Sequence, residues 1–326
     1  MGQLVDGVWT EDGARTAKDG QFIRPSPKYR NWVTPDGSPG PSGTGGFAAE
    51  AGRYHLYVAY SCPWAHRTII MRKLKGLESV ISMSAVSPLM LKDGWTFNKE
   101  EGSTGDAING TAKLSEVYLK ADPRYTGRVS VPVLWDKKSG TIVNNESPEI
   151  IRMFNSAFDA FTNVRADYYP EALRAEIDRV NDAVYTNINN GVYRSGFATS
   201  QAAYETAARA VFDTLEDLEQ RLSQHRYLVG NQITEADWRL FCTLIRFDAV
   251  YHGHFKCNWR RIEDYPNLSN YVRDLYQQPG IAETVKLGEI KYHYYASQLK
   301  VNPTGVVPIG PELDYNRPHD RARFKS

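Results

Sequence analysis

Apolar residues recur with two different periods along residues 54–84, and each change of period marks a new element. Residues 54–60 alternate apolar side chains in the pattern of a strand. Residues 63–74 carry them at helical spacing, with Pro63 at the first helical position, where its missing N–H would have no helical partner. Residues 80–84 form a second short apolar run. The pattern predicts a parallel strand–helix–strand unit with a right-handed crossover.

A hairpin is predicted farther along the chain. Two apolar runs, residues 131–135 and 141–143, flank a polar turn at residues 137–140. Pro132 has no N–H to give to a sheet, which favours an edge strand for the first run. The alternative is a cis Val131–Pro132 bond in a tight functional loop.

A strong helix start follows the hairpin. Ser147 is predicted as the N-cap, Pro148 as the first helical residue, and Glu149 lies in the first turn. Residues 54–155 therefore follow the order βαβ and then ββα. This order predicts a thioredoxin-like domain.

The rest of the chain differs in composition from this α/β region. Residues 1–50 and those after 303 are rich in glycine and proline, and residues 88–127 form a long polar stretch predicted as a loop. Helical spacing recurs in residues 171–189, 201–224, 234–251, 266–276 and 282–298. The predicted organisation is an extended arm (1–50), a thioredoxin-like domain (51–160), an all-helical domain (168–300) and a tail (301–326).

One segment of the helical half has a purely structural interpretation. Thr234, Glu235, Ala236 and Asp237 resemble a capping box, with aspartate in place of the usual glutamate. Ile233 and Trp238 flank it as a hydrophobic staple. We expect this motif to start a helix and to have no chemical role.

Composition narrows the choice of partners. The 326 residues include 39 Lys and Arg against 38 Asp and Glu, so the chain lacks the basic field that nucleic acids or anionic membranes require. The chain contains 20 tyrosines, 12 phenylalanines and 7 tryptophans. Many of these side chains must lie in hydrophobic cores, and the surplus of tyrosine also suits a pocket for a flat aromatic ligand.

Cysteine use and the absence of targeting signals favour a cytoplasmic protein. The chain has 3 cysteines, an odd and low number that provides no disulfide framework. No apolar run approaches the roughly 20 residues that cross a bilayer. The first residues lack the basic and apolar regions of a secretory signal.

Cys62 is the candidate nucleophile because it lies at the predicted strand-to-helix turn. Free N–H groups and the helix dipole stabilise a thiolate there, and cysteines so placed have pKa values of about 3.5–7.5. Ala65 occupies the position of the second cysteine in a dithiol motif, so an external thiol must resolve a mixed disulfide on Cys62. Glutathione is the abundant intracellular candidate. The alternative is that Cys62 is a small buried apolar residue.

Three further features suit a peptide-like ligand with charged ends. Glu146 and Ser147 precede a helix, where a serine hydroxyl and N–H groups bind a carboxylate and Glu146 accepts an ammonium group. An ordinary helix cap explains the same pair equally well. The Val131–Pro132 segment offers backbone pairing, and Arg128 nearby offers a cation for a carboxylate. His66 is interpreted as a structural histidine and not as a base.

Several of these motifs together are specific. They are Ser61-Cys62-Pro63-Trp64-Ala65-His66-Arg67, Asn144-Asn145-Glu146-Ser147, Gly191-Val192-Tyr193-Arg194-Ser195-Gly196-Phe197 and the proline-rich residues 302–311. With these motifs, the chain resembles the glutathionyl-hydroquinone reductases, the Xi class of glutathione transferases, over nearly its whole length.

The resemblance implies a site and a reaction. Cys62 would be the nucleophile, glutathione the co-substrate without any metal, and glutathionylated aromatic hydroquinones the substrates of a homodimer. The implied glutathione-binding residues are Trp95, Arg128, Val129, Glu146 and Ser147. The implied quinone pocket holds Tyr193 and one or both of Tyr294 and Tyr295, whose side chains point about 100° apart on a helix.

The expected reaction is glutathione-dependent reduction of a glutathionyl-hydroquinone through a mixed disulfide of Cys62 with glutathione. An omega-like thioltransferase or dehydroascorbate reductase would share the nucleophile but would need no aromatic pocket. A non-catalytic ligand-binding protein on the same scaffold is the remaining alternative, and the intact cysteine turn and Glu-Ser pair argue against it.

Overall fold

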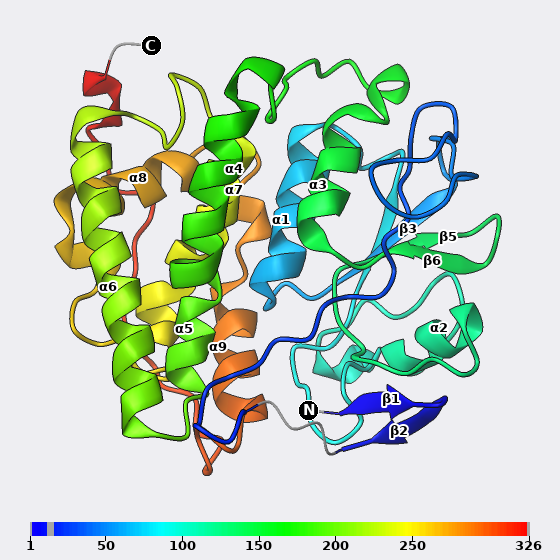
Figure 1. Ribbon diagram of the computed structural model, residues 1–326, viewed down its shortest axis with the longest axis horizontal. Helices are drawn as coiled ribbons and strands as arrows, with labels where there is room; N and C mark the ends of the chain where they lie inside the picture. Colours follow the sequence, from blue (N-terminus) through cyan, green and yellow to red (C-terminus); the bar gives the residue numbers. More distant parts are fainter. Residues whose placement is uncertain (1, 12–15, 325–326) are drawn as a thin grey trace. The chain divides into compact units, whose positions relative to one another are not determined.

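The computed structural model describes residues 2–11 and 16–324, which form two compact units. The first unit contains residues 2–11 and 25–166, and the second contains residues 16–24 and 167–324. Each unit has its own core and is described separately (Figure 1).

The first unit is built on a four-stranded sheet with the order β4-β3-β5-β6. β3 (Tyr54–Val58) runs parallel to β4 (Ser82–Ala85), and α1 (Pro63–Leu74) connects them, which confirms the predicted strand–helix–strand unit. β5 (Val133–Asp136) lies antiparallel between β3 and β6 (Thr141–Asn144). Every residue of β3 is buried, as expected for a strand in the centre of a sheet.

The position of Pro132 decides between the two alternatives left open by the sequence. The Val131–Pro132 bond is cis, and β5 begins only at Val133. β5 has a neighbour on each side, so the prediction of an edge strand is wrong. A proline without an N–H fits here because it lies before the ladder and not within it.

The helix after the hairpin begins one residue earlier than predicted. Glu146 is the N-cap of α3 (Ser147–Ser156), so Ser147 is the first helical residue and Pro148 the second. The turn closes at Glu146 because its N–H donates to Asn144 Oδ1 over 2.7 Å. α1 and α3 pack side by side (Figure 1), and with the strands they complete the thioredoxin-like order βαβ–ββα.

The stretch predicted as a loop, residues 88–127, contains a helix. α2 (Leu114–Ala121) buries Leu114, Val117 and Tyr118, which lie three and four residues apart on one face. The prediction missed α2 because it is short and the glycines before it suggested an irregular loop. A 3₁₀ turn at Lys99–Glu101 adds further order.

Asp106 organises the polar part of this stretch. Its carboxylate accepts hydrogen bonds from the N–H groups of Ile108, Asn109 and Thr111 and from the hydroxyl groups of Thr111 and Tyr57. Burial alone would raise the pKa of Asp106, but these hydrogen bonds outweigh it and lower the pKa below its ordinary value.

The lowered pKa gives a pH-dependent contribution to stability. A carboxyl group whose pKa falls on folding stabilises the protein above its unfolded pKa and loses this effect as the pH falls through the folded pKa. We therefore expect Asp106→Asn to lower the free energy of unfolding at neutral pH. The two proteins should converge as the pH falls below about 4, measured by urea unfolding at a series of pH values. A difference that stays constant into acid would contradict this assignment.

The second unit is helical, as predicted. Its helices are α4 (Arg174–Val184), α5 (Gly191–Gly196), α6 (Gln201–Gln224), α7 (Glu235–Arg246), α8 (Pro266–Tyr276) and α9 (Leu287–Ser297). α4 and α7 each continue into a π-helical turn, Tyr185–Asn189 and Phe247–Tyr251. The sequence pattern missed only the short α5. No helix in the described part of the chain is long and apolar enough to cross a membrane.

The predicted capping box is present at the start of α7. Asp237 accepts hydrogen bonds from Thr234 N over 2.8 Å and from Leu228 N over 2.9 Å, and Tyr271 donates its hydroxyl proton over 2.8 Å. Asp237 is fully buried, so none of these donors has water as an alternative partner. The motif thus joins the start of α7 to the loop before it and to α8.

Removing this carboxylate should destabilise the helical unit strongly. We expect Asp237→Ala to lower the free energy of unfolding by about 3 kcal/mol, because buried donors lose their acceptor. Urea unfolding followed by circular dichroism measures this loss. Asp217→Ala, on the exposed face of α6, is the control and should change stability by less than about 0.5 kcal/mol. Equal effects of the two substitutions would contradict a structural role of Asp237.

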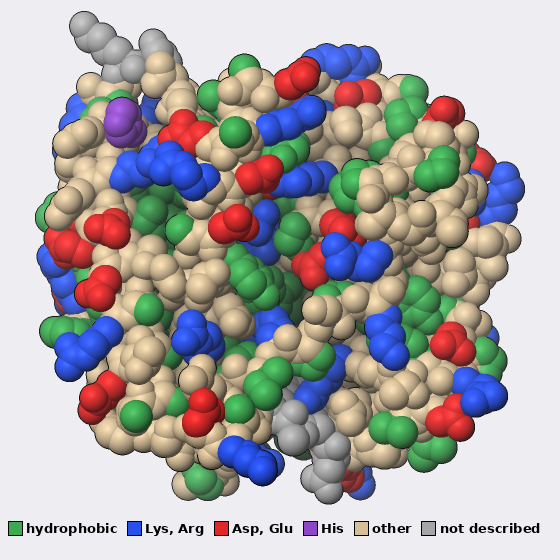
Figure 2. All heavy atoms as spheres, viewed as in Figure 1, with side chains coloured by type: hydrophobic (Ala, Val, Ile, Leu, Met, Phe, Trp, Pro, Cys, Tyr) green, Lys and Arg blue, Asp and Glu red, His purple; other side chains and the backbone are tan. Residues whose placement is uncertain are grey.

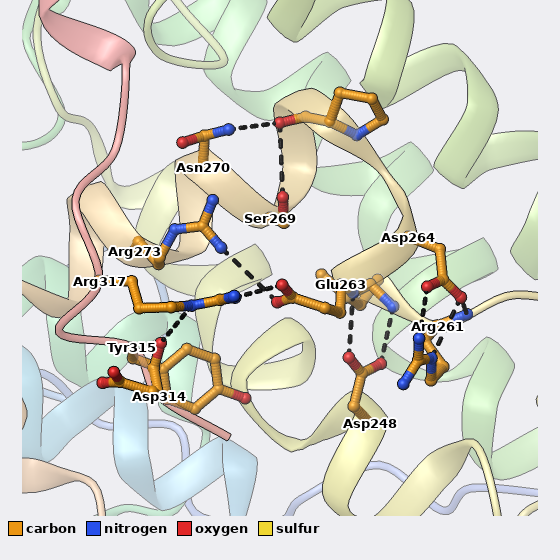
Figure 3. A network of polar contacts seen from close by, with 12 residues as sticks. Asp248, Arg261, Glu263, Asp264, Ser269, Asn270, Arg273, Asp314, Tyr315 and Arg317 are labelled. Carbon is orange, nitrogen blue, oxygen red and sulfur yellow. Dashed lines mark hydrogen bonds and ion pairs between the residues drawn. The ribbon is translucent and has the colours of Figure 1, made fainter. Parts of the chain in front are cut away.

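The C-terminal residues are bound to the helical unit by polar contacts. Glu263 pairs with Arg273 of α8 and with Arg317 of the C-terminal segment (Figure 3). Arg321 is fully buried and donates to three carbonyl groups at the end of α6. Leu222 lies in the last turn of the helix, and His225 and Arg226 follow it. Arg317 and Arg321 therefore hold the described part of the C-terminal segment to the helical unit by specific contacts, although its composition suggested only a tail.

Two minor features complete the fold. β1 (Gln3–Val5) and β2 (Val8–Thr10) form a separate antiparallel pair.

On the face visible in Figure 2, Lys and Arg side chains are interspersed with Asp and Glu side chains, in keeping with the near balance of charge.

Candidate active site

Cys62 is the N-cap of α1, at the turn that follows β3. Pro63 is the first helical residue, as predicted, and the carbonyl group of Cys62 accepts the N–H of His66 over 2.9 Å. Cys62 is partly exposed, whereas Ser61 and His66 beside it are fully buried. The turn therefore holds a reachable thiol on a rigid frame, at the positive end of a helix dipole.

The cis-proline segment lies against this thiol. The Sγ atom of Cys62 is 3.7 Å from the carbonyl oxygen of Val131, the residue before Pro132. Residues 128–132 belong to no helix or strand. The structure thus brings the candidate nucleophile and the segment predicted to pair with a peptide-like ligand together.

The other two cysteines have different surroundings. None of the three cysteines is part of a disulfide, but Cys242 and Cys257 are fully buried in the helical unit. Burial raises the pKa of Cys257 to about 12, so it is a thiol and not a thiolate at neutral pH. Only Cys62 combines exposure with the start of a helix.

The start of α3 is connected to α1 through Arg67, a residue that the sequence analysis did not assign. Its guanidinium group donates to Ser147 Oγ over 3.4 Å and lies 4.6 Å from the ring centroid of Trp64. A serine hydroxyl that accepts from arginine keeps its own proton to donate elsewhere. Arg67 is buried, so it places positive charge beside the helix end at which an anion was predicted to bind.

Residues 25–50 also contact the turn at which α3 begins. Arg30 binds the Glu149 carboxylate through two guanidinium nitrogens, one over 2.8 Å, and Asn144 Nδ2 donates to it over 2.7 Å. The N–H of Asn31 donates to the carbonyl group of Val143 at the end of β6. These contacts fix the turn that leads into Glu146 and Ser147.

The remaining residues implied for glutathione lie in the same unit. Trp95 is nearly buried, and its carbonyl group accepts the N–H of Leu114 at the start of α2. The carbonyl group of Arg128 accepts a hydrogen bond from Tyr125 over 3.2 Å, and Val129 is buried beside it.

Three tyrosines of the helical unit share a hydrogen-bonded cluster, called the tyrosine trio here: Tyr193, Tyr251 and Tyr294. The hydroxyl oxygen of Tyr294 lies 2.5 Å from that of Tyr193 and 2.9 Å from that of Tyr251. Tyr251 and Tyr294 are buried, and Tyr193 is partly exposed. Tyr295, the other candidate on α9, packs on the ring of His254 at 4.7 Å and is not part of the trio.

Two hydroxyl groups of the trio, those of Tyr251 and Tyr294, are neutral. Burial, the largest effect, raises the pKa of Tyr251 and Tyr294 well above the ordinary tyrosine value, while the charge of Arg246 lowers both in part. The hydroxyl groups of Tyr251 and Tyr294 therefore stay protonated at neutral pH and can donate to an oxygen that gains negative charge. Sequence analysis missed Tyr251, because only tertiary packing of the π-helical turn against α9 brings it to Tyr294.

Residues 16–24 cover part of this trio within the helical unit. The guanidinium carbon of Arg24 lies 4.8 Å from the centroid of the Tyr193 ring, and the Phe22 ring stacks on it at 6.4 Å. Among the described residues, no group of His, Cys, Asp and Glu side chains is arranged to hold a metal ion.

Family comparisons agree with this architecture. Residues 61–157 match the family described as "Glutathione S-transferase, N-terminal domain", and residues 201–274 match "Glutathione S-transferase, C-terminal domain". The chain belongs to the glutathione S-transferase family, among its Xi-class members.

Individual relatives are similar over almost their full length. The chain is 58% identical to the glutathionyl-hydroquinone reductase YqjG of Escherichia coli, with 98% of each chain covered. The glutathione-bound structure of YqjG superposes with a TM-score of 0.93 at 57% identity, covering 99% of this chain and 100% of that one. A Xi-class glutathione transferase from Natrialba magadii gives a TM-score of 0.93 at 49% identity, covering 99% and 98%.

Proposed function

We propose that the protein reduces glutathionyl-hydroquinones to hydroquinones with glutathione as the co-substrate. The observation that carries the proposal is Cys62, a reachable thiol at the N-terminus of α1 with no second cysteine in its turn. The similarity to a glutathionyl-hydroquinone reductase and to a glutathione-bound structure supports the choice of substrate and co-substrate.

The reaction has two balanced steps. The Cys62 thiolate attacks the sulfur of the glutathionyl-hydroquinone, and the aryl carbon–sulfur bond breaks. The aryl carbon keeps the electron pair and takes a proton, so hydroquinone leaves and Cys62 forms a disulfide with glutathione. The thiolate of a second glutathione then attacks this disulfide, releasing oxidised glutathione and the Cys62 thiolate.

The roles of the other residues follow from their chemistry. We assign glutathione binding to the domain of residues 51–160, through Trp95, Arg128, Val129, Glu146 and Ser147. We assign the aromatic ring to the domain of residues 168–300, where hydroxyl groups of the tyrosine trio would donate to the ring oxygens as the carbon–sulfur bond breaks. Tyr295 stays a weaker candidate, because it lies outside the trio.

A comparison of substrates tests the function. The purified protein would receive glutathione with either a glutathionyl-hydroquinone, dehydroascorbate or a mixed disulfide of glutathione with a small thiol, and products would be separated by chromatography. We expect release of hydroquinone to exceed reduction of dehydroascorbate. Reduction of the mixed disulfide without any hydroquinone would replace the proposal with an omega-like thioltransferase.

Two further properties belong to the same proposal. We propose a homodimer, which light scattering of the purified protein tests, and a monomer mass would overturn it. We also propose a cytoplasmic location, where glutathione keeps Cys62 reduced. Fractionation of cells that produce the protein tests this location.

Ser147 gives a direct test of the proposed glutathione site. We expect Ser147→Ala to weaken glutathione binding about tenfold, because a hydroxyl donor to the carboxylate is lost at the start of α3. Isothermal titration with glutathione measures the change. Ser156→Ala, at the exposed end of the same helix, is the matched control and should bind normally. Unchanged affinity of the Ser147 variant would remove this residue from the site.

A further inference from the structure

Tyr118 of α2 places one hydroxyl group between two separate segments of the first unit. The side chain is fully buried. Its hydroxyl donates to the carbonyl group of Ser130 over 2.9 Å and accepts the N–H of the same residue over 3.3 Å. It also accepts a hydrogen bond from Asn145 Nδ2 over 3.1 Å. The Tyr118 hydroxyl group thus uses its one proton and both of its lone pairs in hydrogen bonds.

Asn145 is held on its other side as well. Its Oδ1 accepts the N–H of Tyr29 over 3.2 Å, and its own N–H donates to the carbonyl group of Tyr29 over 3.2 Å. Asn145 is 4% exposed, so water does not compete for these bonds. The side chain therefore has a fixed orientation between residues 25–50 and α2.

The two segments joined by Tyr118 are the ones assigned to glutathione. Ser130 lies between Val129 and Val131, in the irregular backbone that contacts Cys62 through the Val131 carbonyl group. Asn145 immediately precedes Glu146 and Ser147 at the start of α3. A ligand that bridges both segments binds most tightly when their separation is set before it arrives.

We propose that Tyr118 is a positioning residue for glutathione, and that its hydroxyl, shared by Ser130 and Asn145, fixes the distance between the two segments that hold the tripeptide. The inference rests on the proposed function and on the glutathione site assigned with it. Tyr118 itself need not touch the ligand. Burial also raises the pKa of Tyr118, so its hydroxyl keeps its proton and donates at neutral pH.

Tyr118→Phe removes the shared hydroxyl and leaves the ring in place. We expect the affinity for glutathione, from isothermal titration of the reduced protein, to fall about tenfold. The KM for glutathione should rise in parallel, while kcat at saturating glutathione stays within about twofold, because the Cys62 turn is untouched. Tyr54→Phe is the matched control, since Tyr54 is equally buried and donates to the Ala48 carbonyl group over 2.7 Å. If Tyr118 had only a structural role, glutathione binding would be weakened in both Tyr118→Phe and Tyr54→Phe, or in neither of them.

A double-mutant cycle tests the connection between the two residues. If Tyr118 acts through Asn145, the loss of affinity in Tyr118→Phe/Asn145→Ala should be smaller than the sum of the two single losses. Additive losses would overturn the proposal, as would Tyr118→Phe binding within about twofold of the wild type. If Tyr118→Phe does not fold, Asn145→Ala is judged by the same affinity criterion, and failure of both to fold would assign the pair a structural role only.

The wild-type protein separates this inference from the function on which it rests. A wild type that neither binds glutathione nor releases hydroquinone would overturn the proposed function. A wild type that does both, beside a Tyr118→Phe variant with unchanged affinity, would overturn only the role of Tyr118.

Discussion

Cys62→Ala is expected to abolish the release of hydroquinone from a glutathionyl-hydroquinone. The loss should be on the order of 10³-fold or more, because no mixed disulfide can form without the sulfur nucleophile. Cys62→Ser should fail equally, since a serine hydroxyl is a poor nucleophile toward sulfur at neutral pH, and this variant should instead show weak conjugation of glutathione to electrophiles. Chromatography of the products measures the loss. Mass spectrometry of the wild type incubated with the glutathionyl-hydroquinone, without added glutathione, should detect Cys62 joined to glutathione.

The buried cysteines provide the controls for this experiment. Cys242→Ala and Cys257→Ala should keep the reductase activity of their folded fraction, because both thiols lie in the core of the helical unit. Hydroquinone release by Cys62→Ala at the wild-type rate would overturn the assignment of the nucleophile. Equal losses in all three variants would indicate a general loss of folding and not of chemistry.

The predictable part of the fold depends on local patterns. The strand before Cys62, the helix from Pro63 and the capping box at Thr234 each have a signature within a few residues of sequence, and the structure confirms all three. α2 lacks such a signature, because its eight residues contain only about two turns and follow several glycines. Its burial is decided by packing near β6, which no local window contains.

The candidate site shows the same difference between residues with a local sequence signal and residues that depend on distant partners. Cys62, Glu146 and Ser147 can be proposed from the sequence because helix starts have a recognisable chemistry of their own. Arg67 and Tyr251 were not found, because their importance depends on partners about 80 and 43 residues away, as the contacts Arg67–Ser147 and Tyr251–Tyr294 record. The sequence also left Tyr294 and Tyr295 equivalent, and only the fold distinguishes the one that meets Tyr193.

Tyr294 is the centre of the tyrosine trio, and Tyr294→Phe should therefore impair the aromatic half of the reaction. The substitution removes the hydroxyl that contacts both Tyr193 and Tyr251. We expect kcat for a glutathionyl-hydroquinone to fall about 10²-fold, the usual effect of losing a donor to a developing oxyanion. Reduction of a mixed disulfide of glutathione with a small aliphatic thiol should continue, because this substrate has no ring oxygen to stabilise. The ratio of the two rates is the measurement.

The control for Tyr294→Phe must lose an equally buried hydroxyl elsewhere in the helical unit. Tyr271→Phe meets this requirement, since Tyr271 is fully buried and donates to Asp237. It should lower stability while the ratio of the two rates stays at the wild-type value. If Tyr294→Phe also leaves the ratio unchanged, the trio does not act on the ring. If Tyr294→Phe slows both substrates equally, the trio supports the fold and the preference for aromatic substrates must arise from other residues.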